Sequence, residues 1–101
     1  MSGHATLELL RADLRRQAFS SAQQRYAREA TYFSAEHLAA RCQQLGVART
    51  RVERELRQAQ RGYDDRLARK ISFLVDDTQA QLLACERERT YRSAHVVQLR
   101  I

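Results

Sequence analysis

A chain of 101 residues is long enough for one domain with a modest hydrophobic core and too short for several. Its 44% hydrophobic and 30% charged residues are typical of a folded protein, and without proline almost nothing interrupts helix formation. We expect neither a membrane span nor a secretion signal, since the sequence has no run of about 18 apolar residues and no basic-then-apolar start.

The first predicted helix begins at Thr6 and reaches about Phe19, and its apolar stripe continues as far as Phe33. Apolar residues at steps of three and four share one helical face in its first half. They are Leu7, Leu10, Leu14 and Ala18. Ser20 and Ser21 each precede a glutamine by three residues, which is a helix-capping signature. The pattern fits either a helix that restarts there or one continuous rod.

Ser34 is the predicted N-cap of the next helix, from Ala35 to Leu45. Gly46 follows the last apolar residue of that pattern, where glycine commonly ends a helix in the left-handed conformation. The short connection from Val47 to Arg49 then predicts an antiparallel neighbour, because short links between helices normally join antiparallel pairs.

A long central helix is predicted from Thr50 to about Val75. Thr50 and Glu53 form a capping box at its start, and Gly62 inside it allows a kink. Its apolar positions follow one another at steps of three or four and predict a buried seam. They are Val52, Leu56, Ala59, Tyr63, Leu67, Ile71 and Leu74.

The opposite side of this central helix carries arginines, which we call the arginine face. They are Arg51, Arg54, Arg57, Arg61 and Arg69. Guanidinium groups along one helix face can neutralise phosphates or carboxylates of a partner. An ordinary solvated face is the other interpretation, since Glu53 precedes Arg57 by four residues and Asp65 precedes Arg69 by four. No aromatic residues interleave with the arginines, so base stacking is not indicated.

A break near residue 76 and a last helix to about Arg92 complete the helical part. Residues 96–101 are β-prone, with apolar residues that alternate with polar ones. We expect this tail to be extended and to contact another molecule through its apolar side chains. These are Val96, Val97, Leu99 and Ile101.

The sequence offers no recognisable chemistry. The histidines and the two cysteines, Cys42 and Cys85, do not have the spacing of a zinc site, and no phosphate loop or nucleophile motif occurs. We therefore expect no catalytic residue, no metal and no cofactor. Both cysteines occupy apolar positions, where they are expected to be reduced in a cytoplasmic protein.

The predicted fold class is all-α: a small antiparallel helical bundle or long helical hairpin of three to four helices, with a short extended C-terminal tail. Residues 1–101 form one domain, with a flexible stretch at residues 1–5. The function that fits best is a non-enzymatic assembly or adaptor module, a subunit of a homo-oligomer or a larger protein complex. The alternative is a basic accessory protein that binds the nucleic-acid backbone through the arginine face, with no membrane partner in either case.

Overall fold

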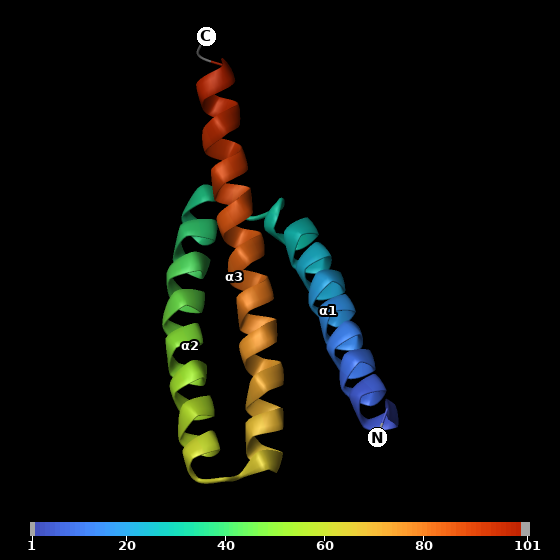
Figure 1. The fold of residues 1–101 in the computed structure, drawn as a ribbon. Helices are drawn as coiled ribbons and strands as arrows, with labels where there is room; N and C mark the ends of the chain where they lie inside the picture. The colour runs from blue at the N-terminus through green and yellow to red at the C-terminus, as the bar shows by residue number, and fades with distance from the viewer. Residues whose placement is uncertain (1, 100–101) are drawn as a thin grey trace.

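A computed structural model describes the backbone of residues 2–99 and the side chains of residues 6–95. The chain forms three helices, α1 (Ser2–Ala30), α2 (Ala35–Arg61) and α3 (Asp65–Leu99), and the described part contains no strand (Figure 1). The predicted all-α fold is thereby confirmed. α1 passes through Ser20 and Ser21 without a break, so the first 30 residues form one rod.

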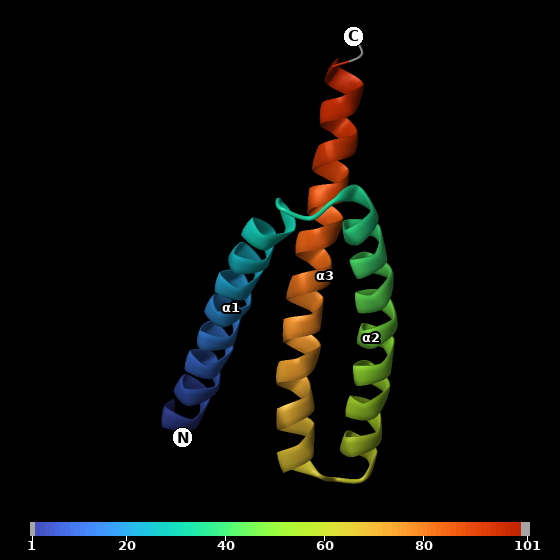
Figure 2. The same ribbon diagram turned by 180° about the vertical axis from the view of Figure 1, so that it is seen from behind.

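α3 is the central helix. α1 and α2 each pack along α3 but make little contact with each other, and both views show α3 between them (Figures 1 and 2). The molecule is therefore a thin layer of three helices, with extents of 60 × 29 × 19 Å. Because α1 and α2 do not close against each other, the two broad faces of α3 have no further helix over them.

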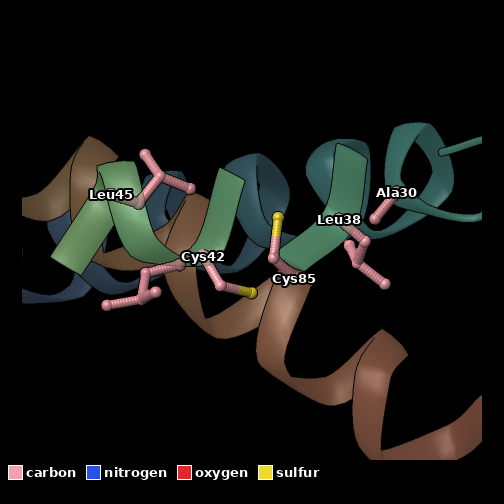
Figure 3. Close-up of a cluster of buried hydrophobic side chains, with 6 residues drawn as sticks. Ala30, Leu38, Cys42, Leu45 and Cys85 are labelled. Carbon is pink, nitrogen blue, oxygen red and sulfur yellow. The ribbon is translucent and has the colours of Figure 1, made fainter. Parts of the chain in front are cut away.

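The main core cluster lies where the C-terminal end of α1 meets the first turns of α2 and the middle of α3. It is built from residues of all three helices, with Phe33 packed against it (Figure 3). Its members are Ala30, Leu38, Cys42, Leu45, Leu82 and Cys85. Leu38 is the largest fully buried side chain among the described residues. A core built of so few large side chains stabilises the fold modestly.

Ser34 is the N-cap of α2, as predicted. Its backbone is extended, with φ −64° and ψ 161°, and its Oγ accepts a hydrogen bond of 3.1 Å from the amide of His37. This bond satisfies one of the amides that the first turn of a helix leaves unpaired.

The prediction of one long central helix from Thr50 to Val75 is wrong. α2 continues through Gly46 as far as Arg61, and α3 begins at Asp65. The Thr50 hydroxyl donates a hydrogen bond of 3.2 Å to the carbonyl of Gly46 within α2, so it does not cap a helix. A glycine inside a helix costs only about 1 kcal/mol, which packing of α2 on α3 offsets.

The antiparallel turn between α2 and α3 therefore lies at residues 62–64. The amide of Asp64 donates to the Ala59 carbonyl at 3.0 Å, and the amide of Tyr63 donates to the Gln60 carbonyl at 3.2 Å. This is a Schellman helix end, and its left-handed residue is Tyr63, with φ +58°. Asp64 then caps α3, since its Oδ1 accepts a 3.0 Å bond from the amide of Leu67.

The predicted break near residue 76 is also wrong, because α3 continues without interruption to Leu99. No glycine or proline occurs after Gly62, so nothing in the backbone ends the helix. The tail expected to be extended from residue 96 is accordingly helical as far as Leu99, the last residue described. The side chains of Val96, Val97, Leu99 and Ile101 lie outside the described residues, and so do those of the predicted flexible stretch at residues 1–5.

Candidate protein-interaction surface

Among the described residues, α1 has partly or fully buried side chains only in its C-terminal half. Every residue from Thr6 to Ala18 is exposed, whereas partly or fully buried positions occur from Phe19 to Ala30. Figure 1 shows the N-terminal half of α1 leaning away from α3. Residues 7–14 of α1 therefore lack the burial on which helical stability in proteins usually depends.

The apolar stripe predicted for the start of the chain exists, and it faces solvent. The exposed fractions are 53% for Leu7, 54% for Leu10 and 56% for Leu14. Single exposed leucines are common on protein surfaces, but leucines at helical spacing on one face form a continuous apolar strip. We call these three residues the leucine strip.

A groove of about 600 Å³ lies between this part of α1 and the start of α3. Its lining combines apolar side chains with arginines from both helices. The lining residues are Arg11, Leu14, Arg15 and Ala18 of α1 with Arg69, Ser72 and Phe73 of α3. The Phe73 side chain is 71% exposed within it, which is unusual for a large aromatic residue on a helix that neighbours another helix.

Arg15 joins α1 to α3 at this groove. Its Nε donates to Asp76 Oδ2 at 2.5 Å and its Nη2 donates to Asp76 Oδ1 at 3.0 Å, a bidentate pair. The carboxylate of Asp76 thereby neutralises the charge of Arg15. Among the described residues, Arg11 and Arg69 take part in no ion pair, so the groove carries two uncompensated positive charges.

A chain of hydrogen bonds crosses all three helices beside the core. Tyr26 on α1 donates to Asp77 Oδ1 on α3 at 2.6 Å, and Gln81 donates to Asp77 Oδ2 at 2.8 Å. Arg41 on α2 donates to Gln81 Oε1 at 2.7 Å. Burial and the hydrogen bond to Asp77 raise the pKa of Tyr26. This network and the Arg15–Asp76 ion pair together tie α1 to α3 between residues 15 and 26.

The predicted arginine face is divided by the turn at residues 62–64. Arg51, Arg54, Arg57 and Arg61 are exposed on α2, but Arg69 lies on α3 and lines the groove. The expected pairing of Glu53 with Arg57 and of Asp65 with Arg69 does not occur, since no described ion pair contains these residues. Arg51, Arg54, Arg57 and Arg61 are therefore exposed and have no carboxylate partner among the residues described.

Side chains able to hold a metal do not gather in the described part of the chain, where no group of three or more such ligands occurs. Cys42 and Cys85 are both buried free thiols. Burial raises the pKa of the Cys85 thiol, which disfavours the reactive thiolate. No helix among residues 2–99 has a stretch long and apolar enough to cross a membrane.

The chain matches no protein-family model, no curated protein and no solved structure. Its own geometry is therefore the basis for a functional proposal. That geometry contains an apolar strip without a partner, a groove beside it and a separate exposed row of arginines.

Sequence reasoning missed the groove and the hydrogen-bond network. The predicted break near residue 76 falls at Asp76 and Asp77, which instead bind Arg15 and Tyr26 of α1 within an uninterrupted helix. The sequence signal for an uninterrupted helix was the absence of glycine and proline after Gly62, although aspartates by themselves favour helix caps. The α1 residues that pair with them could not be identified without the topology.

Proposed function

We propose that this chain is a non-enzymatic helical assembly or adaptor module, a subunit of a homo-oligomer or of a larger protein complex. The observation that supports this most is the leucine strip, Leu7, Leu10 and Leu14, which is more than half exposed on a stretch of α1 without buried residues. Contiguous apolar surface of this kind on a small protein marks an interaction site.

Burial of the leucine strip would stabilise a complex substantially. Full burial of one leucine is worth about 1.5–3 kcal/mol, so three half-exposed leucines together could contribute on the order of 2–4 kcal/mol. Residues 7–14 of α1, all exposed, would also gain packing from the same contact. Two free, buried cysteines are compatible with a reducing compartment, and a cytoplasmic location is part of the proposal.

The test is the assembly state of the full chain, together with the proteins that co-purify with it at low salt. We expect sedimentation or light scattering to detect an oligomer, or affinity purification to recover a partner at fixed stoichiometry. The triple substitution of Leu7, Leu10 and Leu14 by glutamine should abolish that association. Val47→Gln is the matched control, because Val47 is an equally exposed apolar residue on α2. A monomer without a stoichiometric partner, or an association that survives the triple substitution, would contradict the proposal.

The second candidate is binding to the nucleic-acid backbone by the arginines of α2. Arg51, Arg54, Arg57 and Arg61 are all exposed, and residues 51–61 span about 15 Å of helix, enough for several phosphates. Replacement of these four arginines by glutamine should then weaken duplex and single-strand binding and reduce its dependence on salt.

A control with the same net charge separates this candidate from a general attraction to a basic protein. The control replaces four exposed arginines elsewhere by glutamine. They are Arg25, Arg28, Arg87 and Arg89. Equal loss of binding in both variants, or no binding by the wild type at about 50 mM salt, would exclude a specific role for α2.

A further inference from the structure

We propose that the groove between α1 and α3 binds an amphipathic helix of a partner protein, one whose apolar stripe is flanked by acidic side chains. This inference rests on the proposed function and specifies the partner. It follows from the shape, the lining and the charge of the groove.

The shape is that of a site for a helix. α1 and α3 diverge towards the N-terminus of α1, and the groove of about 600 Å³ lies between them. Arg11, Leu14 and Ala18 follow one another at steps of three and four along α1, so they lie on the same side of that helix. An added helix would pack its apolar stripe against Leu14, Ala18 and Phe73, as in other complexes where a helix binds a hydrophobic groove.

The leucine strip extends the apolar surface beyond the groove. Leu7 and Leu10 precede Leu14 on the same face of α1 and are each more than half exposed. A bound helix that followed α1 over this length would cover the whole strip. Its anchoring residues would sit at helical spacing, opposite those of α1.

The charge of the groove selects an acidic occupant. Arg11 lies on the α1 side and Arg69 on the α3 side, and neither has an ion-pair partner among the residues described. Carboxylates beside the apolar stripe of a bound helix would pair with both guanidinium groups and fix its register. A second copy of this chain fits worse, because two such grooves face to face would bring like charges together.

The test uses two synthetic helical peptides and the full-length chain. Both peptides have leucines at helical spacing, and the residues beside the leucine stripe are glutamate in one and lysine in the other. Fluorescence anisotropy should show at least about tenfold tighter binding of the glutamate peptide. Phe73→Gln and Leu14→Gln should each weaken it by about tenfold or more, whereas Val47→Gln on α2 should leave it unchanged.

Charge reversal provides the decisive comparison. Arg11→Glu combined with Arg69→Glu should invert the preference, so that the lysine peptide binds more tightly. Arg54→Glu combined with Arg57→Glu makes the same change in net charge on exposed positions of α2 and should keep the original preference. An inverted preference in both double variants would overturn the groove as the site, and so would an unchanged preference in both.

Failure of this inference differs from failure of the proposed function. If the glutamate peptide does not bind, the acidic-helix proposal is overturned. The proposed function still holds in that case if the triple substitution of the leucine strip dissolves an assembly of the wild-type chain. If the wild-type chain forms an oligomer and the Phe73→Gln variant does not, the groove is a contact between copies of this chain. That result would also overturn the proposal of an acidic partner helix.

Discussion

The guanidinium Nη2 of Arg92 on α3 donates a hydrogen bond of 2.8 Å to the carbonyl of Phe33 in the connection between α1 and α2. The same nitrogen lies 3.2 Å from the Ala30 carbonyl and 3.3 Å from the Thr31 carbonyl. The Thr31 and Phe33 carbonyls lie in the connection between α1 and α2, and the Ala30 carbonyl also accepts a 3.1 Å hydrogen bond from the amide of Phe33, so this arginine ties the end of α1 and the connection to α3. Its Nε pairs with Glu88 at 2.9 Å, which holds the side chain in place.

Replacement of Arg92 by alanine should therefore destabilise the whole three-helix arrangement. Hydrogen bonds that involve a charged group contribute about 1.5–3 kcal/mol, and we expect a loss in that range in urea unfolding. Arg92→Lys should recover only part of it, because an ammonium group lacks the planar fork of the guanidinium. Arg89→Ala removes an exposed arginine of the same helix and should change stability by less than about 0.5 kcal/mol. Equal effects of the two alanine variants would show that Arg92 does not hold the connection.

Tyr26 should make the stability of the protein sensitive to alkaline pH. Burial and the hydrogen bond to Asp77 raise its pKa above the ordinary value of 10.0. A raised pKa means that the folded state favours the protonated phenol. This contribution is fully present below the unfolded pKa and is lost as pH rises through the folded pKa.

The measurement is the free energy of unfolding as a function of pH, from neutral to above about 10. The free energy of unfolding of Tyr26→Phe should be about 1 kcal/mol lower than that of wild type at neutral pH, because one hydrogen bond is lost. At alkaline pH it should fall less steeply than that of wild type, because no phenol at this position can ionise. Tyr32→Phe is the control, since Tyr32 is 89% exposed. Identical alkaline slopes for wild type and Tyr26→Phe would contradict the role of the phenol.

Tyr63 occupies the position in a Schellman helix end that glycine normally takes. Its φ of +58° strains a residue with a side chain, and that side chain is 89% exposed, so it gains little from packing. Tyr63→Gly relieves this strain but gives the unfolded chain more conformational freedom. The net effect should be a rise of about 0.5–1 kcal/mol in the free energy of unfolding. Tyr63→Ala keeps the strain and should stay within about 0.5 kcal/mol of wild type. A loss of stability in Tyr63→Gly would mean that the turn depends on the tyrosine ring.

The helical class and the Ser34 cap could be predicted because both depend on local chemistry: the absence of proline and a hydroxyl at the right position. The position of the hairpin turn could not. Gly46 directly follows the apolar Leu45 and so has the pattern of a helix stop, whereas Gly62 follows Arg61 and lies between Ala59 and Tyr63 of a continuing apolar pattern. A glycine inside a helix costs only about 1 kcal/mol relative to alanine, so local preference alone does not fix the position of the turn. The packing of α2 on α3 fixes it.

The candidate interaction surface was predictable only in part. Periodicity identified Leu7, Leu10 and Leu14 as one apolar face, but it gives no information about what covers that face. Arg69 was grouped with the arginines of α2 because one helix was assumed through residue 62. Once the turn lies there, Arg69 belongs with Arg11 in the groove. The wrong helix boundary at residues 62–64 is therefore the reason why Arg69 was predicted on the arginine face and not in the groove.

Gly46→Ala distinguishes the observed fold from the one the sequence suggested. In the structure Gly46 lies inside α2, a Cβ added there would meet nothing within 4 Å, and no described glycine has a positive φ. Alanine is about 0.8–1.0 kcal/mol more favourable than glycine in a helix interior. We therefore expect Gly46→Ala to raise the free energy of unfolding by about 1 kcal/mol, measured by urea denaturation followed by circular dichroism.

Gly62→Ala is the matched control at the true turn. Gly62 has φ −82°, which alanine adopts freely, and an added Cβ would lie 3.5 Å from the Gln58 carbonyl oxygen, an ordinary contact. This substitution should be neutral or stabilise by less than about 1 kcal/mol, through lower entropy of the unfolded chain. A hairpin turn at residues 46–49 would instead require Gly46→Ala to lower the free energy of unfolding. If Gly46 ended a helix in the left-handed conformation, alanine there would cost about 1–2 kcal/mol, and such a loss would move the hairpin turn back to residues 46–49.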